Sequence, residues 1–385
     1  MKNKITFVIA MAMTFFISAD AFAQLVTSGA DDGTDGTLRN EIADTPIGGV
    51  ITFDTSVTTV TLNSELLIDK DLIISGNSIT PLTIDANNNG RIFNITAGLV
   101  VLNDLMLING LDVDGGAIYM TNAVVTINNS TISGNTANGA SGSGGGIFNA
   151  IGGVLVVNNS EISNNTANRA GGGIEDNSGA GLSITLLNVN LDNNNAGVSP
   201  ATAAPGNGGG LHITGAGSAI VNGGTVNGNV AGKEGGGLWN GSGVLDVIDV
   251  MITGNSAVGD ATGGGGIYNN GNGTINISAG TTLVGNIASG TTPGGRGGAI
   301  FNNTSGILNL ANGLAITGNY ASRAGGAIED SSNGTLILSC YTNRKCCRCR
   351  HWIRKYNYTK PRKWWCCTFI WYNQCNNFGF FNSFK

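Results

Sequence analysis

Residues 1–339 contain no cysteine, and the whole chain of 385 residues has only six prolines and two histidines. The missing cysteine excludes a disulfide framework and a thiolate metal site from this part of the chain. The scarcity of proline, without a triplet glycine period, excludes collagen. Charged residues are also scarce at 11 %, yet 41 % of the residues are hydrophobic, so the composition is not that of a disordered chain.

Glycine is abundant instead, with 62 residues. That load would destabilise helices by about 1 kcal/mol per residue, which makes an ordinary helical or α/β enzyme a poor fit. The composition therefore favours an all-β chain with very many turns.

The segment 340–385 has a different composition from the rest of the chain. It holds all seven cysteines, four of the five tryptophans and ten of the 19 basic residues, and it has no acidic residue. If the codons of this segment are read one base later, they permit Thr-Gly-Asn at 343–345 and Gly-Asn-Gly-Gly from Arg362. Both short sequences are typical of the chain before residue 340. We interpret 340–385 as an aberrant, frameshifted tail, with loss of the C-terminal cap and of any anchoring domain; resequencing from codon 330 tests this.

The tail has two alternative interpretations. Its cysteines could ligate zinc, although Cys346-Cys347-x-Cys349 and Cys366-Cys367 lack the usual two-residue spacing. Its basic and aromatic residues could contact nucleic acid, but a shifted frame accounts for the same composition, so we expect no nucleic-acid partner.

The first 23 residues are typical of a signal peptide. Lys2 and Lys4 precede the apolar run 5–17, and Ala21-Phe22-Ala23 forms a small-residue cleavage signal before Gln24. The run is shorter than the roughly 20 residues that a spanning helix needs. We expect export, no transmembrane segment in the mature chain, and a location at the cell surface, in the outer membrane or outside the cell.

An internal repeat is the strongest signal in the chain. A Gly-Gly-Ala/Gly-Ile/Leu tetrad recurs at steps of 27 to 37 residues, and an Ile/Leu/Val-x-x-Asn element lies between successive tetrads. The tetrads end at Ile118, Ile147, Ile174, Leu211, Leu238, Ile267, Ile300 and Ile328.

One repeat contains three short strand-like runs, 147–149, 154–158 and 161–163, separated by turn residues. Alternation places Ile147, Leu155, Val157 and Ile162 on one side. Such strands bury an apolar face only by stacking on the next repeat. The fold class that we predict is all-β: a right-handed parallel β-helix of about ten coils with the pectin-lyase-like superfold.

The repeats define the domain boundaries. Apolar runs in 24–110 continue the rhythm without the tetrad, and we expect an N-terminal cap and opening coils there, followed by β-helix repeats over 111–339. Asparagine recurs once per repeat at positions 149, 240, 269 and 302, where stacked amides can hydrogen-bond as a ladder.

The paired tetrad and Ile/Leu/Val-x-x-Asn motifs over 25–339 resemble the repeats of polymorphic outer membrane proteins and related bacterial secreted β-helix proteins, in which phenylalanine begins the second motif. The opening Gly33-Thr34-Asp35-Gly36-Thr37-Leu38-Arg39 is similar to the start of many such proteins. The resemblance implies a right-handed β-helix displayed at or released from the cell surface, often for adhesion, with no catalytic residues.

Two sets of residues are candidate binding sites. The first follows the tetrad in successive repeats and would form an interrupted aromatic stripe for a sugar or a protein: Tyr119, Phe148, Trp239, Tyr268 and Phe301. His212 shares that position, so an outward wall location is expected for it. The second set, Glu175-Asp176 and Glu329-Asp330, replaces the aromatic-Asn pair; alternation points the glutamates outward and gives the aspartates the ladder position.

These patterns favour a non-enzymatic adhesion or interaction scaffold whose partner is an extracellular glycan or a host or neighbour surface protein. The alternative is a carbohydrate-active β-helix enzyme, a polysaccharide lyase or glycoside hydrolase. Convergence of two carboxylates, or of a carboxylate and a base, on one wall would favour the enzyme. We expect no catalytic residues, no resident metal and no cofactor, with calcium at Asp-rich turns as the open alternative.

Overall fold

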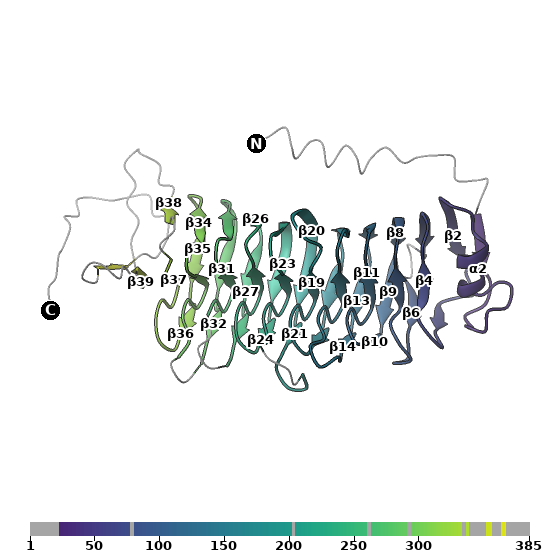
Figure 1. The fold of residues 1–385 in the computed structure, drawn as a ribbon, viewed down its shortest axis with the longest axis horizontal. Coiled ribbons are helices and arrows are strands. Elements are labelled where there is room, and N and C mark those ends of the chain that lie inside the picture. Colours follow the sequence, from purple (N-terminus) through teal and green to yellow (C-terminus); the bar gives the residue numbers. More distant parts are fainter. Residues whose placement is uncertain are drawn as a thin grey trace.

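The computed structural model describes residues 23–332, except 78–80, 202–204, 260–262 and 291–293, and the backbone of 336–338, 352–355 and 363–366. The chain winds into a straight rod, a parallel β-solenoid of about 10 turns, with a short helix at its N-terminal end (Figure 1). The predicted all-β parallel solenoid is therefore confirmed. Within the described residues, no helix is long and apolar enough to cross a membrane.

Three sheets run along the rod. The 12-stranded sheet begins each turn with the residues that follow a tetrad, and its neighbours in order are β4 (Leu66–Ile68), β7 (Phe93–Ile95), β11 (Ile118–Met120), β15 (Ile147–Asn149), β19 (Ile174–Asp176), β22 (Leu211–Ile213), β25 (Leu238–Asn240), β29 (Ile267–Asn269), β33 (Ile300–Asn302), β37 (Ile328–Asp330), β39 (Trp352–Lys355) and β40 (Lys363–Cys366).

The 20-stranded sheet supplies two strands, or one long strand, to each turn. It contains β1 (Ala23–Val26), β2 (Gly49–Phe53), β3 (Thr59–Thr61), β5 (Leu72–Ser75), β6 (Leu82–Asp85), β8 (Gly98–Asn103), β9 (Leu105–Ile108), β12 (Ala123–Asn128), β13 (Thr131–Ser133), β16 (Val154–Asn158), β17 (Glu161–Ser163), β20 (Gly181–Asp192), β23 (Gly217–Asn227), β26 (Val244–Ile248), β27 (Met251–Thr253), β30 (Thr274–Ile277), β31 (Thr282–Val284), β34 (Ile307–Leu310), β35 (Ala315–Thr317) and β38 (Leu336–Leu338).

The 8-stranded sheet closes each turn with a two-residue strand. It contains β10 (Leu111–Asp112), β14 (Thr136–Ala137), β18 (Thr166–Ala167), β21 (Asn195–Ala196), β24 (Val230–Ala231), β28 (Ser256–Ala257), β32 (Ile287–Ala288) and β36 (Tyr320–Ala321). The three strand-like runs predicted for one repeat coincide with β15, β16 and β17, whereas β18 is a fourth element that the pattern did not predict.

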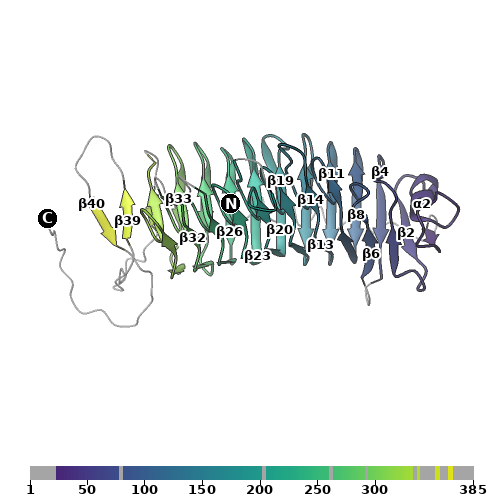
Figure 2. The same ribbon diagram turned by 90° about the horizontal axis from the view of Figure 1, so that it is seen from below.

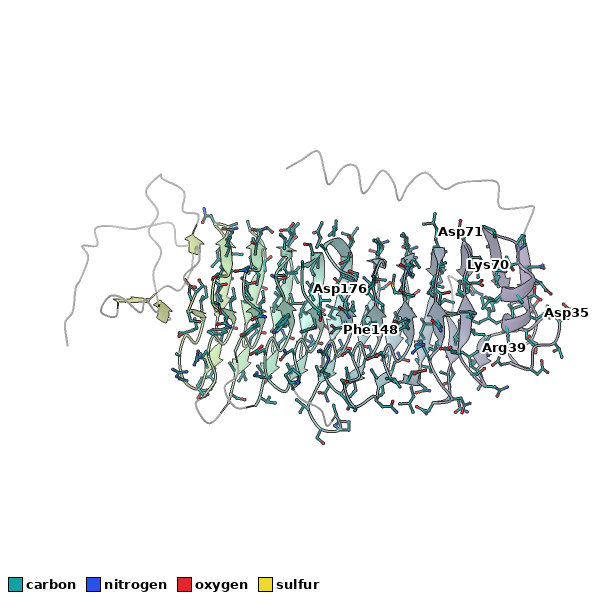
Figure 3. All side chains as sticks on the ribbon, in the orientation of Figure 1. Asp35, Arg39, Lys70, Asp71, Phe148 and Asp176 are labelled. Atoms are coloured by element: carbon teal, nitrogen blue, oxygen red, sulfur yellow. The ribbon has the colours of Figure 1, made fainter. Side chains whose placement is uncertain are left out.

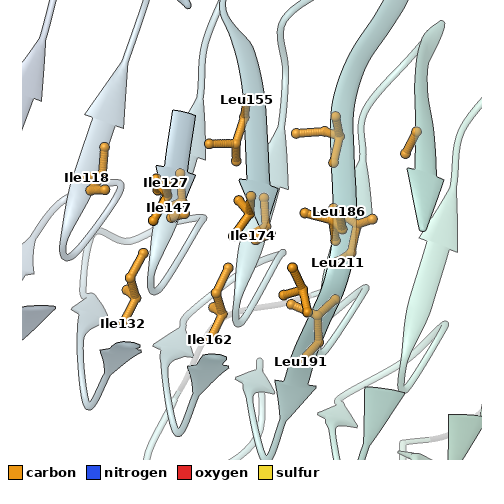
Figure 4. Packing of buried hydrophobic residues seen from close by; sticks show 14 of the residues in the cluster. Ile118, Ile127, Ile132, Ile147, Leu155, Ile162, Ile174, Leu186, Leu191 and Leu211 are labelled. Atoms are coloured by element: carbon orange, nitrogen blue, oxygen red, sulfur yellow. The ribbon is translucent and has the colours of Figure 1, made fainter. Parts of the chain in front are cut away.

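The core lies inside the coil and continues from turn to turn. Ile147, Leu155, Val157 and Ile162 are all 0 % exposed, as alternation predicts, and equivalent side chains stack on them along the axis (Figure 4). Ile147 pairs in parallel register with Ile118 on one side and with Ile174 on the other. Apolar burial is therefore shared between neighbouring turns, as expected of a solenoid.

The tetrad glycines have a steric explanation. Gly144 begins its tetrad with a left-handed φ of 67°, which glycine adopts without strain. Gly145 comes next, and a Cβ there would lie 2.3 Å from the carbonyl oxygen of Gly172 in the following turn. The tetrad is thus the place where backbones of successive turns approach too closely for a side chain.

Helix α2 (Leu38–Asp44) lies at the N-terminal end of the rod, where it buries Leu38 and Ile42 (Figure 2). Arg39 on this helix pairs with Asp31 at 2.7 Å. At the other end, β39 pairs in parallel with β37, and β40 pairs antiparallel with β39. The frameshift hypothesis for 340–385, and the cysteine side chains on which a zinc site would depend, fall outside the described residues.

Candidate functional site: the outer row of the 12-stranded sheet

The predicted aromatic residues and the two predicted glutamates form one row, whereas Asp176 and Asp330 lie at the next position along their strands. From β7 to β37, the central residue of each strand of the 12-stranded sheet pairs in register with its neighbours, in the order Asn94, Tyr119, Phe148, Glu175, His212, Trp239, Tyr268, Phe301 and Glu329. Alternation turns these side chains away from the main core. Trp239, Tyr268 and Phe301 accordingly make a separate apolar cluster.

The aromatic rings are covered rather than open to solvent. Trp239, Tyr268 and Phe301 are 8 %, 4 % and 4 % exposed, and their rings lie over one another with centroid distances of 6.0 and 5.2 Å. The chain at Gly263 packs against two of these rings, because a Cβ there would lie 2.7 Å from Phe301 Cδ1 and 3.1 Å from Tyr268 Cε2. The side chain of Glu234 also accepts a hydrogen bond from Trp239 Nε1 at 3.1 Å.

Tyr119 and Phe148 form a second pair on the same row, half-buried and stacked at 5.4 Å. The Arg91 guanidinium lies 5.1 Å from the centre of the Tyr119 ring and pairs with Glu65 at 2.8 Å. The side chains of the row therefore point outward, as expected, but loops and ring stacking cover most of their surface. In this state the three buried rings offer little face on which a sugar could stack.

A buried carboxylate–imidazole pair interrupts the aromatic row. His212 Nδ1 lies 2.9 Å from Glu175 Oε2 and 3.1 Å from Glu175 Oε1, and Thr214 Oγ1 donates to Glu175 Oε1 at 2.5 Å. The imidazole stacks on Trp239 at 4.2 Å, and Arg169 Nη2 lies 3.8 Å from Glu175 Oε1. Glu175 is 0 % exposed and His212 is 4 % exposed.

The sequence carries a signal for this pair that alternation alone does not show. Glu175 and His212 each follow a tetrad in consecutive repeats, so parallel stacking must place them side by side. The carboxylate and the base do converge, which is the criterion set for an enzyme. However, although both side chains point away from the main core, both groups are buried from solvent.

The second acidic pair does not join the first. Glu329 lies five strand pairings beyond Glu175 along the row and is 1 % exposed. The two glutamates therefore cannot act on one glycosidic bond, which needs carboxylates about 5–10 Å apart. In the described part of the chain, no group of three or more His, Cys, Asp or Glu residues could hold a metal ion.

Asp176 and Asp330 occupy the ladder position, as predicted. Asn149 Nδ2 donates to Asp176 Oδ1 at 2.8 Å, and the run Asn240, Asn269, Asn302 ends with Asn302 donating to Asp330 Oδ1 at 3.1 Å. Asp176 pairs next with Ile213, which offers no side-chain acceptor. A carboxylate ends the ladder without leaving an amide N–H unpaired, which explains aspartate at this position.

Asp176 gives a pH prediction (Figure 3). Burial raises the pKa of its carboxyl above 3.8, although Ser183, Ser178 and Asn149 donate hydrogen bonds that oppose the shift. The folded state then holds this proton more tightly than the unfolded state, so Asp176 lowers stability as pH rises through its folded pKa. Relative to Asp176→Asn, the wild type should lose stability between pH 4 and pH 7 in denaturant titrations.

Asp54 is the matched control for this prediction. Hydrogen bonds from Ser56 lower the pKa of its carboxyl, so its stabilising effect is fully present above pH 4 and is lost only at more acidic pH. Asp54→Asn should therefore leave the slope of the profile between pH 4 and pH 7 unchanged. A difference between wild type and Asp176→Asn that is constant over this range would contradict the assignment.

Comparison with known proteins adds little to this geometry. No protein-family model matches the chain, and no curated protein matches it. Among solved structures, ORF18 of Geobacillus virus E2 is similar with a TM-score of 0.37 and 11 % identity, over 94 % of this chain and 65 % of that one. The chain thus spans about two thirds of that protein, and so distant a likeness supports no functional argument.

Proposed function

We propose that the chain is an exported, non-enzymatic interaction scaffold that acts at the cell surface, in the outer membrane or outside the cell. The observation that carries the proposal is the in-register stacking of about 10 turns, which presents long, rigid lateral faces with a constant spacing between turns. Repetitive faces of this kind suit extended partners such as a glycan or a surface protein. Export rests on the signal-like residues 1–23, and adhesion on the resemblance to polymorphic outer membrane proteins.

The experiment expresses the full-length coding sequence in a Gram-negative bacterium and examines cell fractions. We expect the chain outside the cytoplasm, beginning at Gln24 by N-terminal sequencing. A substitution of Ala21 and Ala23 by bulky residues should block cleavage. A chain that stays in the cytoplasm with Met1 intact would overturn the export proposal.

A carbohydrate-active enzyme is the second candidate, and the Glu175–His212 pair is the observation that favours it. If this pair were catalytic, purified protein would release reducing ends or unsaturated products from a polysaccharide panel, and His212→Gln would abolish that release. Because Glu175 and His212 are buried against Trp239 and Thr214, we expect no turnover. Turnover that depends on His212 would reject the non-enzymatic proposal.

A further inference from the structure

A polar groove of about 370 Å³ crosses three consecutive turns on the outside of the 20-stranded sheet. It lies where each turn bends between its two strands, on a different face from the aromatic row. The groove is lined by Asn129, Ser130, Thr131, Asn159, Ser160, Glu161, Asn188 and Asn190.

The groove is made by a bend that recurs in each turn. Asn129, Asn159 and Asn188 have left-handed φ angles of 48°, 48° and 53°, a conformation that asparagine tolerates better than most residues. Hydrogen bonds between turns fix this backbone: Glu161 N donates to Ser130 O at 2.9 Å, and Asn190 N donates to Ser160 O at 3.0 Å. The groove is therefore rigid before any ligand binds.

Its exposed side chains carry unused hydrogen-bonding capacity. Asn159 Oδ1 accepts a hydrogen bond from Asn188 Nδ2 at 3.2 Å, and Asn190 Oδ1 accepts one from Thr225 Oγ1 at 3.0 Å. Asn159 and Asn190 are both exposed, so their amide nitrogens can donate to a ligand. Among the described residues, the side chains of Asn129 and Glu161 have no hydrogen-bond or ion-pair partner. Planar amides and a carboxylate, held at the spacing of the turns, can pair with neighbouring hydroxyl groups.

The charge of the groove restricts the ligand. Glu161 is its one charged lining residue, and residues 1–339 carry 24 acidic against nine basic groups. Asp192 lies near Glu161. The pKa of the Asp192 carboxyl is raised by partial burial and, to a smaller extent, by the charge of Glu161. A polyanion would be repelled here. A hard cation such as calcium prefers several carboxylates, and only one lines the groove.

We propose that this groove binds a neutral, linear glycan by hydrogen bonds to the hydroxyl groups of the glycan, with Glu161 and Asn190 as the principal contacts. The inference rests on the proposed function and names the ligand class for one lateral face. The first and third turns are about 10 Å apart by strand spacing, a length comparable to two linked sugar rings. Thr131, Glu161 and Asn190 follow one another in register, so each turn would contact the chain of sugars once.

The experiment titrates the full chain with cellohexaose and chitohexaose as neutral probes and with polygalacturonate as the polyanion. Binding is measured by calorimetry and by protection from hydrogen exchange at β13, β17 and β20. We expect a neutral probe to bind with millimolar or better affinity and to protect the groove, and polygalacturonate to bind more weakly. The double variant Glu161→Ala/Asn190→Ala should weaken binding about 10-fold, from the loss of two to three hydrogen bonds.

The matched control changes two residues on the same outward row beyond the groove. Met251 follows Thr225 in register and Thr282 follows Met251, so Met251→Ala/Thr282→Ala removes side chains from the row outside the groove and should leave affinity unchanged. Two results would overturn the proposal: neither neutral probe binds, or both double variants bind a probe as the wild type does. Such a result would leave the export proposal intact, because export is tested separately by fractionation.

Discussion

Replacing Asn194 by alanine should lower the free energy of unfolding by about 4 kcal/mol, because several buried polar groups then lose their partners. Asn194 is 0 % exposed and lies inside the turn. Its Oδ1 accepts hydrogen bonds from both the backbone N and the side-chain Nδ2 of Asn165, each at 3.0 Å. Its own Nδ2 donates to Ile162 O at 2.8 Å and to Asn229 Oδ1 at 3.0 Å.

This arrangement repeats along the rod and explains the asparagine of each Ile/Leu/Val-x-x-Asn element. The same pair of bonds to the next asparagine joins Asn135, Asn165, Asn194, Asn229, Asn255, Asn286 and Asn319. Each side-chain amide therefore pairs with the backbone of the preceding turn, as Asn194 does with Asn165 N and Ile162 O, and with the side-chain amides of both neighbouring ladder residues. An aliphatic side chain of similar size could not replace it.

Asn128→Ala is the matched control, because Asn128 belongs to a ladder on the outer surface. Its side chain donates to Asn103 Oδ1 at 2.8 Å and accepts from Asn158 Nδ2 at 2.8 Å. Water can replace these bonds, so the cost should be about 1 kcal/mol. Native-state hydrogen exchange measures each cost locally, at β17, β20 and β21 for Asn194→Ala and at β8, β12 and β16 for Asn128→Ala. A local measurement matters because long repeat arrays depart from two-state unfolding. Equal costs for the two variants would contradict the inner-ladder explanation.

Much of the fold could be predicted because period-two alternation and the repeat act on every turn. The core positions of Ile147, Leu155 and Ile162 follow from alternation alone, and the repeat length indicates that turns stack. The two-residue strand β18 was not predictable in this way, because two residues are too few to show a pattern. Its pairing depends on the turns that flank it.

The candidate site was predicted less well, for a physical reason. Register fixes which residues share a row, and the order of Phe148, Glu175 and His212 follows from it. Exposure depends instead on where the connecting loops lie, and the loop at Gly263 returns over the aromatic row. The step from Glu175 to His212 is also longer than most, so their contact becomes evident only when the turns are superposed.

Gly236→Ala should be as damaging as loss of the inner amide, with a cost of roughly 4 kcal/mol and a large fall in yield. Gly236 is the second residue of its tetrad. A Cβ there would lie 2.3 Å from Gly265 O and 2.6 Å from both Ser256 N and Ser256 C. All three are backbone atoms of the next turn, so the methyl group fits only if the turns separate and break the hydrogen bond from Gly236 N to Gly264 O.

The neighbouring Gly237 provides the control for that substitution, since it occupies the third tetrad position, where other turns carry Ala117, Ala299 and Ala327. A Cβ at Gly237 would lie 2.7 Å from Gly266 O, compared with 2.3 Å from Gly265 O at Gly236, and three other turns accommodate alanine at this position. Gly237→Ala should therefore cost less, about 1 to 2 kcal/mol, within the range of overpacking. Thermal unfolding and hydrogen exchange at β24, β25 and β28 would measure both variants. If the two alanines were equally tolerated, close backbone approach could not be the reason that the second tetrad glycine recurs in every repeat. If only Gly236→Ala opens these strands, the distance between turns sets the repeat motif.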